Sequence, residues 1–428
     1  MSFIPLLLTV VGAYFLIRLR AFFLCHPLRT LRLTFRALRK EDGRSLVAFA
    51  LALAGTLGVG NLSGVALGLL VGGAGSLFWI WVSSVFACVL KYAEVLIAKD
   101  VSSYEGNGMM QVIRRFVPGG RAVSGVYALV CLLLACTMGA MLQSRAVTEC
   151  ATSAIGVSSP VVSLVVTALL LFVIVGGASR IERAVSVTVP VAALCYIVLS
   201  VGVLCVGYRY IPSALAAVWN GAFSTRGVLG GVIGTLTSEA VRRGFAGGLL
   251  SNEAGAGTSA LAHVRSSGTS PSAQGLIGMC EVVCDTAICT LTGLSLLVGT
   301  RGSLPSASSV EPIEWLSDVF AGSLGGWCRG VLLLSVFAFA FSTIVCWYYY
   351  GRRCALYLWQ GMPSWLYALL YLASAFLGGI VTSRLTVRVV DLSLGVLCVL
   401  SLGALLAAER RICTLHRAQF LPLRDTRV

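Results

Sequence analysis

The sequence predicts an all-α polytopic membrane protein with eleven transmembrane helices. Only 11% of its 428 residues are charged, whereas soluble domains carry roughly 25%. Its apolar residues recur in runs of about 20, the length that crosses a hydrocarbon core of about 30 Å as a helix. The mean hydropathy of +0.91 points the same way. This composition excludes a soluble enzyme, a disordered chain and a disulfide scaffold.

The net charge of +15, from 32 Lys and Arg against 17 Asp and Glu, is interpreted as membrane orientation rather than nucleic-acid binding. The basic residues stand between the apolar runs, where positive charge marks the cytoplasmic side. The 15 cysteines include no C-x-x-C pair, and most lie inside apolar runs, where thiols act as small hydrophobes. We therefore expect no nucleic-acid partner, no disulfide and no metal centre. The first apolar run lacks a basic start and a small-residue cleavage site, so we expect a membrane span there and not a signal peptide.

The apolar runs fix the predicted elements in chain order. The eleven candidate helices lie near residues 3–24, 46–71, 75–98, 123–149, 158–178, 184–207, 228–262, 272–299, 325–350, 363–383 and 388–408. The connection after the first run carries eight basic residues, namely Arg18, Arg20, Arg29, Arg32, Arg36, Arg39, Lys40 and Arg44. Because basic residues collect on the cytoplasmic side, the N-terminus is expected outside. Alternation then places 23 of the 32 Lys and Arg, and the C-terminus, in the cytoplasm.

Two predicted helices contain glycine-rich interruptions. One spans Gly55–Asn61 in the second helix, and the other spans Gly244–Gly257 in the seventh. Glycine weakens a helix by about 1 kcal/mol relative to alanine, so both segments are expected to unwind. Unwound backbone is tolerated at membrane depth only where it is buried in protein or lines a cavity. Both interruptions are therefore candidate sites.

The placement of the interruptions predicts a transporter. With the first helix set aside, they fall in helices 1 and 6 of a ten-helix core, which are equivalent positions in two five-helix halves. Because five is odd, the halves have opposite orientations in the membrane. Paired interruptions of this kind indicate a secondary transporter with inverted repeats. The predicted divisions are an extra first helix with a basic segment (1–45), two five-helix repeats (46–210 and 211–410) and a basic tail (411–428).

Motifs along the chain carry a resemblance to a known family. The main ones are Ser251-Asn252-Glu253-Ala254-Gly255, Gly58-Val59-Gly60-Asn61, Gly72-Gly73-Ala74-Gly75, Phe341-Ser342-Thr343 and Trp347-Tyr348-Tyr349-Tyr350-Gly351. With these motifs in order over most of its length, the chain resembles the alanine or glycine:cation symporters, which have the leucine-transporter-type fold. The resemblance implies sodium-coupled uptake of a small neutral amino acid by alternating access. It implies no cofactor apart from the transported sodium ion.

The resemblance also implies where the cargo binds. The substrate carboxylate is expected against the unwound backbone of core helix 1, with contacts from core helices 3, 6 and 8. The expected substrate residues are Thr56, Gly58, Gly60, Asn61, Gln143, Leu250, Ser251, Asn252 and Trp347. The expected sodium ligands are the hydroxyl oxygens of Ser342 and Thr343 and the main-chain carbonyls of Ala54 and Leu57.

These residue types suit that chemistry. A zwitterion in a dry site needs partners for both charges, because leaving one unpaired costs several kcal/mol. Main-chain N–H groups at a helix start suit the carboxylate, and carbonyl or amide oxygens suit the ammonium group and sodium. Simpler roles remain open: interhelical hydrogen bonds for Gln143 and Asn252, back-bonding within the helix for Ser342 and Thr343, and an interfacial anchor for Trp347.

The sequence departs from the family pattern beside the expected pocket. The departures are Val59 for threonine, Ala140 and Arg145 for two asparagines around Gln143, Gly247 for arginine and Leu250 for phenylalanine. They leave the fold prediction intact. They leave the substrate open between alanine or glycine and another amino acid.

Acidic residues inside apolar runs are functional candidates by default. Three of them have a basic neighbour in the sequence and are predicted to form structural ion pairs: Glu94 with Lys91, Glu182 with Arg180 or Arg183, and Glu149 with Arg145. Glu253 and Asp285 have no such neighbour. We expect these two to make hydrogen bonds that fix core helices 6 and 7.

We therefore expect a monomeric sodium:amino-acid symporter in the lipid bilayer of the plasma membrane, and not an enzyme. One alternative is a transporter of the same fold with another amino-acid substrate or with proton coupling. A second alternative is a non-transporting amino-acid sensor, which would bind its ligand without accumulating it. A membrane enzyme is disfavoured because the spans contain no Ser/His pair and no His/Cys metal constellation.

Overall fold

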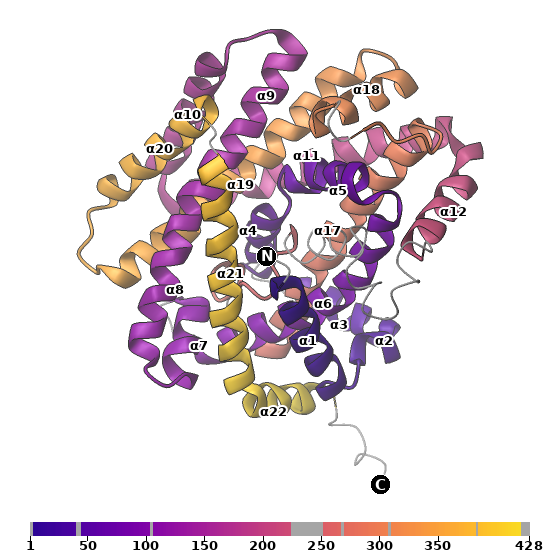
Figure 1. Cartoon of the computed structure of the whole chain (residues 1–428). Coiled ribbons are helices and arrows are strands. Elements are labelled where there is room, and N and C mark those ends of the chain that lie inside the picture. Colours follow the sequence, from indigo (N-terminus) through magenta and orange to yellow (C-terminus); the bar gives the residue numbers. More distant parts are fainter. Residues whose placement is uncertain are drawn as a thin grey trace.

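A computed structural model describes residues 3–39, 44–102, 106–223, 251–266, 269–306, 310–381 and 384–420. These residues form helices joined by turns, with no strand among them. Figure 1 shows the long helices side by side as a bundle, with α4 (Arg44–Thr56) near its middle. Residues 50–56 of α4 are all buried, so the middle of the bundle is packed protein.

The helices follow one another with short connections. Up to the second interruption they are α1 (Phe3–Arg18), α2 (Phe22–Cys25), α3 (Pro27–Leu38), α4, η1 (Gly60–Gly64), α5 (Val65–Gly72), α6 (Gly75–Val101), α7 (Gly108–Phe116), α8 (Gly120–Leu134), η2 (Ala135–Leu142), α9 (Gln143–Ile155), α10 (Ser159–Val175), α11 (Gly177–Val206), η3 (Tyr208–Tyr210) and α12 (Ile211–Ala222). Beyond it they are α16 (Ala260–His263), α17 (Pro271–Gly299), α18 (Pro312–Leu324), α19 (Cys328–Leu358), α20 (Ser364–Ile380), α21 (Arg384–Ala407) and α22 (Glu409–Phe420).

Several described helices have the length and composition to cross a membrane. Six qualify alone, and a seventh qualifies if α4 and the helical segment Gly60–Gly72 count as one bent span. Three shorter apolar helices, Ile4–Arg18, Ser159–Val175 and Ser364–Ile380, coincide with further predicted spans. Most of the span predicted near 228–262 lies outside the described residues. The chain is thus a multi-span helical protein, and the count of eleven stays a prediction.

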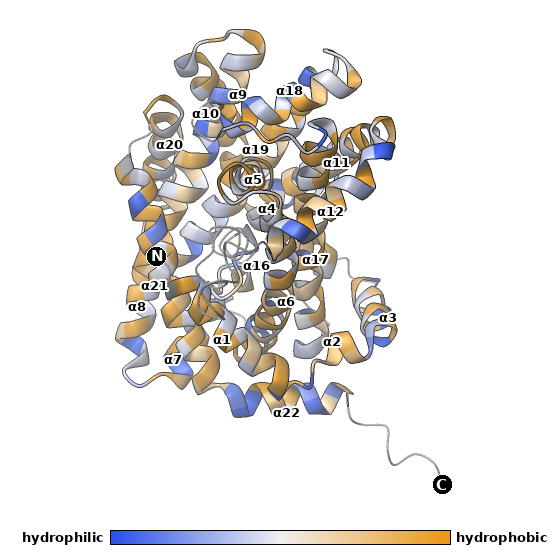
Figure 2. Ribbon diagram, turned by 45° about the vertical axis from the view of Figure 1, so that its right-hand side comes forward, coloured by the Kyte–Doolittle hydropathy of each residue, from blue (hydrophilic) through white to orange (hydrophobic). Residues whose placement is uncertain are grey.

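Five helices lie outside the predicted runs, namely α3, α7, α12, α18 and α22. In α7, Met109, Met110 and Val112 are buried while Arg114 and Arg115 are exposed. A helix with one apolar face and one charged face does not produce a long apolar run, so run length does not detect it. Figure 2 shows such mixed colouring on α3 and α22 at the edge of the molecule.

Glycines set the close approach of α6 and α17. A Cβ atom on Gly278 would lie 2.7 Å from Val95 Cγ2, and one on Gly275 would lie 2.9 Å from the Tyr92 main-chain oxygen. Only glycine allows the two backbones to come this near. The contact places the buried polar side chains of both helices within reach of each other.

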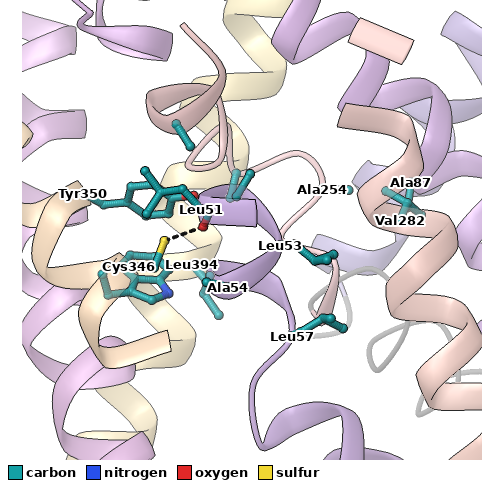
Figure 3. Close-up of a cluster of buried hydrophobic side chains, with 14 of the residues drawn as sticks. Leu51, Leu53, Ala54, Leu57, Ala87, Ala254, Val282, Cys346, Tyr350 and Leu394 are labelled. Atoms are coloured by element: carbon teal, nitrogen blue, oxygen red, sulfur yellow. Dashed lines mark hydrogen bonds between the residues drawn. The ribbon is translucent and has the colours of Figure 1, made fainter. Parts of the chain in front are cut away.

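Helix α4 is held against α19 by apolar contacts and by a hydrogen bond from a thiol. Figure 3 shows Leu51 of α4 beside Cys346 and Tyr350 of α19, with Ala54 close by. The Cys346 thiol donates a hydrogen bond to the Leu51 main-chain oxygen at 3.0 Å. This contact joins α4 to α19 next to the first interruption.

Docking of α22 should weaken in acid. The Tyr92 hydroxyl lies 3.0 Å from His416 Nδ1, and the rings of Phe22 and Phe420 flank the imidazole. Burial, helped by Arg417, lowers the pKa of His416 from its usual value to about 4. The folded state therefore favours the neutral ring, so this stability is complete above about pH 6.5 and declines as the pH falls toward 4. We expect wild-type thermal stability to fall across this window and His416→Gln to remove that part of the fall; equal pH profiles would contradict the assignment.

Candidate functional site

The first glycine-rich interruption is a break in the helix. Helix α4 ends at Thr56, the chain becomes helical again at Gly60, and the two helical segments meet at 50°. The restart is a π-helical turn, and a second π-helical stretch, η2, ends immediately before Gln143. Stretches of this kind occur often at functional sites. The break predicted from Gly55–Asn61 is confirmed.

Three helices converge on Gly58 in this break. The Val59 N–H donates a hydrogen bond to Gln143 Oε1 at 3.3 Å. A Cβ atom on Gly58 would lie 3.1 Å from Thr343 Oγ1 and 3.3 Å from the Gln143 amide, closer than nearly all real Cβ contacts. The structure thus brings an expected substrate residue from α9 and an expected sodium ligand from α19 to the same point of unwound backbone.

Carbonyl oxygens surround the Thr343 hydroxyl. Its Oγ1 lies 2.8 Å from the Ala54 oxygen, 3.3 Å from the Leu57 oxygen and 2.9 Å from the Phe339 oxygen. One hydroxyl proton cannot satisfy three acceptors at once. The Ser342 hydroxyl donates to the same Phe339 oxygen at 2.9 Å, the back-bonding that the sequence left open. The Thr343 hydroxyl and the Ala54 and Leu57 carbonyls therefore lie together as a buried, oxygen-rich group, and Ser342 shares the Phe339 acceptor with Thr343.

The second interruption is irregular backbone where it is described. After Ser251 the chain makes turns until α16, and the φ angles are +50° at Glu253, +86° at Gly255 and +74° at Gly257. A positive φ at a non-glycine residue is a strained conformation that surrounding contacts must hold. Asn252 is buried in this segment. The expected residue Leu250 and the departure at Gly247 lie outside the described residues.

Asp285 of α17 joins the two breaks. Its Oδ1 accepts from Asn61 Nδ2 at 2.5 Å, and its Oδ2 accepts from the Ser251 hydroxyl at 2.8 Å. The hydrogen bonds predicted for Asp285 are therefore present. Sequence reasoning did not find that its two partners belong to different breaks. In the sequence, Asp285 is an acidic residue without a basic neighbour in an apolar run. This pattern marks Asp285 as a candidate functional residue but does not indicate which residues it contacts.

The other expected residues take mixed positions. Trp347 is completely buried, one turn after Thr343, so it is no interfacial anchor. Gly139 leaves room for its indole, because a Cβ there would lie 2.3 Å from Trp347 Cβ. The Thr56 hydroxyl back-bonds to the Leu53 oxygen at 3.2 Å, whereas Gly60 is exposed. Trp347 therefore lies on the buried side of the site, and Gly60 lies on its exposed side, which we call the open side.

A cavity of about 920 Å³ adjoins the open side, and we call it the entry cavity. Its wall includes Ser63 and Gly64 of the restarted helix and Arg145 and Glu149 of α9. Arg145 Nε donates to Glu149 Oε1 at 2.6 Å, so this predicted ion pair is confirmed. The departure at Arg145 thus lies in the wall of this cavity.

Two predicted ion pairs are wrong. The Lys91 ammonium lies 3.7 Å from Glu281 Oε2 and forms no ion pair with Glu94. Glu182 pairs with Arg265 at 2.7 Å and not with its basic neighbours in the sequence. In both cases a partner from a distant part of the chain replaces the local one. Sequence spacing shows only local partners, whereas helix packing decides which charges meet.

A family profile and several individual relatives point to the same protein family. A sequence profile of the sodium:alanine symporter family matches residues 1–419. An uncharacterized transporter of Haemophilus influenzae is 31% identical over 95% of this chain and 91% of its own length. The sodium/alanine symporter AgcS of Methanococcus maripaludis is 29% identical, with 84% of this chain and 80% of the relative covered. The probable sodium/glutamine symporter GlnT of Bacillus subtilis is 26% identical, with 95% and 86% covered.

Solved structures agree on the fold. MhsT in complex with L-phenylalanine matches with a TM-score of 0.55 at 13% identity, over 84% of this chain and 87% of its own. A manganese transporter of Eremococcus coleocola matches with a TM-score of 0.55 at 14% identity, over 86% and 76%. Both are transporters of the leucine-transporter type. The motifs, the fold and the near-complete match of the family profile lead to one conclusion: the chain belongs to the sodium:alanine symporter family.

Proposed function

We propose that this protein is a sodium-coupled symporter of a small neutral amino acid, alanine or glycine, that works by alternating access. The observation that carries the proposal is the convergence on Gly58 of unwound backbone, the Gln143 amide and the Thr343 hydroxyl. Family membership supports the sodium and amino-acid cargo.

The sodium ion is proposed to bind at the oxygen-rich group. The Ala54 and Leu57 carbonyls lie at the C-terminal end of α4, which is the negative end of a helix dipole. Oxygen atoms of Thr343 and Ser342 complete the set from α19. A hard cation prefers oxygen ligands of this kind. A buried carbonyl oxygen whose hydrogen-bonding capacity is not fully used is stabilised when it binds such a cation.

The substrate is proposed to bind beside it. The half-helix that begins at Gly60 presents the positive end of its dipole to the carboxylate. Gln143 and Asn252 offer amide oxygens to the ammonium group. The remaining proposed contacts are Thr56, Gly58, Asn61, Leu250, Ser251 and Trp347. The tight packing at Gly58 and the buried Trp347 favour a small side chain.

Glutamine is a second candidate substrate. Arg145 lines the entry cavity two residues after Gln143 and offers donors to a longer polar side chain. The relative GlnT is described as a probable sodium/glutamine symporter.

One sodium ion supplies enough energy for uptake. A membrane potential of about 100 mV contributes roughly 2.3 kcal/mol per charge. A tenfold sodium gradient adds about 1.4 kcal/mol. Together, about 3.7 kcal/mol supports roughly 500-fold accumulation of a neutral amino acid. We propose a stoichiometry of one sodium ion per substrate.

The membrane arrangement completes the proposal. We place eleven spans in the plasma membrane, with the N-terminus outside and the C-terminus in the cytoplasm. The core comprises the repeats 46–210 and 211–410, flanked by the extra first helix and basic segment (1–45) and the basic tail (411–428). We propose that the protein acts as a monomer. Cysteine labelling from each side of the membrane tests the orientation.

Uptake into proteoliposomes tests the function. Labelled alanine, glycine and glutamine are supplied separately, with and without an inward sodium gradient, and with the gradient collapsed by an ionophore as control. We expect sodium-dependent accumulation of alanine or glycine. Accumulation of glutamine alone would indicate that Arg145, in the wall of the entry cavity, determines the substrate specificity. Saturable binding without accumulation would contradict transport and favour a sensor.

A further inference from the structure

Helix α3 turns its large apolar side chains away from the protein. Leu28, Leu31 and Phe35 are 78%, 53% and 54% exposed. Their spacing of three and four residues places them on one face of the helix, and we call them the apolar stripe. An amphipathic helix normally turns such a face toward the core of its own protein. The apolar stripe therefore needs an apolar partner from outside the chain.

The buried face of α3 carries small side chains instead. Thr30, Thr34 and Ala37 are buried, and the helix packs against α17 and α4. The Thr34 hydroxyl donates to the Thr30 main-chain oxygen at 2.9 Å, so it is satisfied within its own helix. The protein thus holds α3 by a face of small residues and leaves the apolar stripe uncovered.

A third face of α3 is basic. Arg29, Arg32 and Arg36 are all exposed, and we call them the arginine stripe. At 3.6 residues per turn, its centre lies about 100° around the helix from the centre of the apolar stripe. Arg29 also lies over the ring of Phe420, with 5.8 Å between the guanidinium carbon and the ring centre. The ion pairs found among the described residues involve none of the three arginines.

Helix α7 shows the ordinary arrangement for comparison. Its apolar residues Met109, Met110 and Val112 are buried, and its basic residues Arg114 and Arg115 are exposed. Both helices are amphipathic and carry neighbouring arginines. They differ because the apolar face of α7 is used by the protein itself, whereas that of α3 is not. Exposed arginines beside exposed apolar side chains are therefore a feature of how α3 is placed.

Helix α3 lies where a bilayer meets the protein. In the chain it stands between α1, an apolar helix that coincides with a predicted span, and α4, the first part of the bent span. Figures 1 and 2 show α3 at the periphery of the bundle, toward the end that carries α7 and α22 and away from α9 and α18. A basic amphipathic helix at the end of membrane spans is typical of the headgroup region of a bilayer.

A phospholipid is the partner that matches both stripes at once. Its acyl chains suit the apolar stripe, and its phosphate suits the guanidinium groups, which bind phosphate through paired hydrogen bonds. Free inorganic phosphate has no apolar part. A second copy of this chain, packed face to face on α3, would bring its own arginines against these and so place like charges together. The charge and the apolar stripe together therefore select a lipid.

We propose that α3 is a binding site for anionic phospholipid. The apolar stripe lies among the acyl chains, and the arginine stripe binds the negatively charged headgroups beside them. Clusters of basic residues next to a membrane span favour anionic over neutral lipids in this way. The inference goes beyond the proposed function, because it concerns neither the amino acid nor sodium.

Fluorescence quenching by brominated lipids tests the proposal. Phe35→Trp adds an indole to the apolar stripe, and the signal of the eight native tryptophans is subtracted by means of the wild type. The full-length protein is reconstituted in mixed vesicles of phosphatidylglycerol, which is anionic, and phosphatidylcholine, which has no net charge. One of the two lipids carries bromine in its acyl chains. Because bromine quenches an indole only at contact, the quenching reports which lipid lies beside α3.

The anionic lipid should be enriched at the added indole. Each arginine near an anionic surface contributes about 5-fold, so we expect a preference for phosphatidylglycerol of roughly 10-fold or more at low salt. Added salt should reduce this preference, because it screens the charges. Replacing Arg29, Arg32 and Arg36 together by glutamine should bring the preference close to one. Arg114→Gln with Arg115→Gln, a similar loss of exposed arginines on α7, should leave it unchanged.

Three results would overturn the proposal. If neither brominated lipid quenches the added indole, protein and not lipid covers the apolar stripe. Equal quenching by the two lipids in the Phe35→Trp protein would show that α3 does not select a headgroup, and this result needs no arginine variant to fold. A preference that persists in a folded variant without the arginine stripe would assign the selection to other residues. Since no arm of the experiment uses sodium or an amino acid, its failure would leave the proposed transport function untouched.

Discussion

Uptake should lose its dependence on sodium when Ser342 and Thr343 are both replaced by alanine. The double change removes two hydroxyl oxygens from the oxygen-rich group and leaves the Ala54 and Leu57 carbonyls without their partner from α19. A hydrogen bond or ligand to a charged group is worth about 1.5–3 kcal/mol, so two of them correspond to a fall in sodium affinity of roughly 100-fold or more. The measurement is initial alanine uptake into proteoliposomes as a function of external sodium.

Single variants separate the two hydroxyls. Thr343 contacts both carbonyls of α4, whereas Ser342 bonds within its own helix, so Thr343→Ala should have the larger effect. Ser335→Ala is the matched control, because Ser335 is also buried on α19 and back-bonds to the Val331 oxygen at 2.9 Å. It should leave the sodium dependence unchanged. Unaltered sodium-driven uptake in the double variant would place the ion elsewhere.

Much of the fold was predictable because membrane burial imposes a simple pattern. The run 75–98 corresponds to α6 at Gly75–Val101, and the glycines of 55–61 mark a real break of 50°. Amphipathic helices such as α7 and α22 were missed, because only one of their faces is apolar. The length and composition of an apolar run therefore locate a membrane span. They do not reveal the short amphipathic helices that connect or follow the spans.

The candidate site was predictable where a motif fixes local backbone. Ala54, Leu57 and Thr343, named from the family resemblance, lie together as expected. The partners of buried charges were not predictable: Lys91 meets Glu281 of α17, 190 positions away, instead of Glu94 on the same helix. Such pairs depend on how closely two helices pack, and glycines such as Gly278 decide that only in three dimensions.

Removing the buried cation should strongly destabilise the fold. Lys91 and Glu281 are both completely buried, and Lys91 Nζ also donates to Ser259 Oγ at 3.0 Å. Methionine at position 91 keeps the length of the side chain but leaves Glu281, among the described residues, with His263 as its one hydrogen-bond partner. Breaking a buried pair in this way costs about 3–5 kcal/mol, because the remaining charge stays buried without a counter-charge. Thermal or denaturant unfolding in detergent measures the loss.

The second half of a double-mutant cycle shows whether charge is the cause. Glu281→Gln removes the stranded charge, so Lys91→Met with Glu281→Gln should be more stable than Lys91→Met alone. Arg145→Met is the matched control, because its pair with Glu149 is largely exposed and such pairs contribute about 0–1 kcal/mol. If the double variant were no more stable than Lys91→Met, the loss would come from packing of the lysine stem, and the pairing of charge across α6 and α17 would not be what stabilises the middle of the bundle.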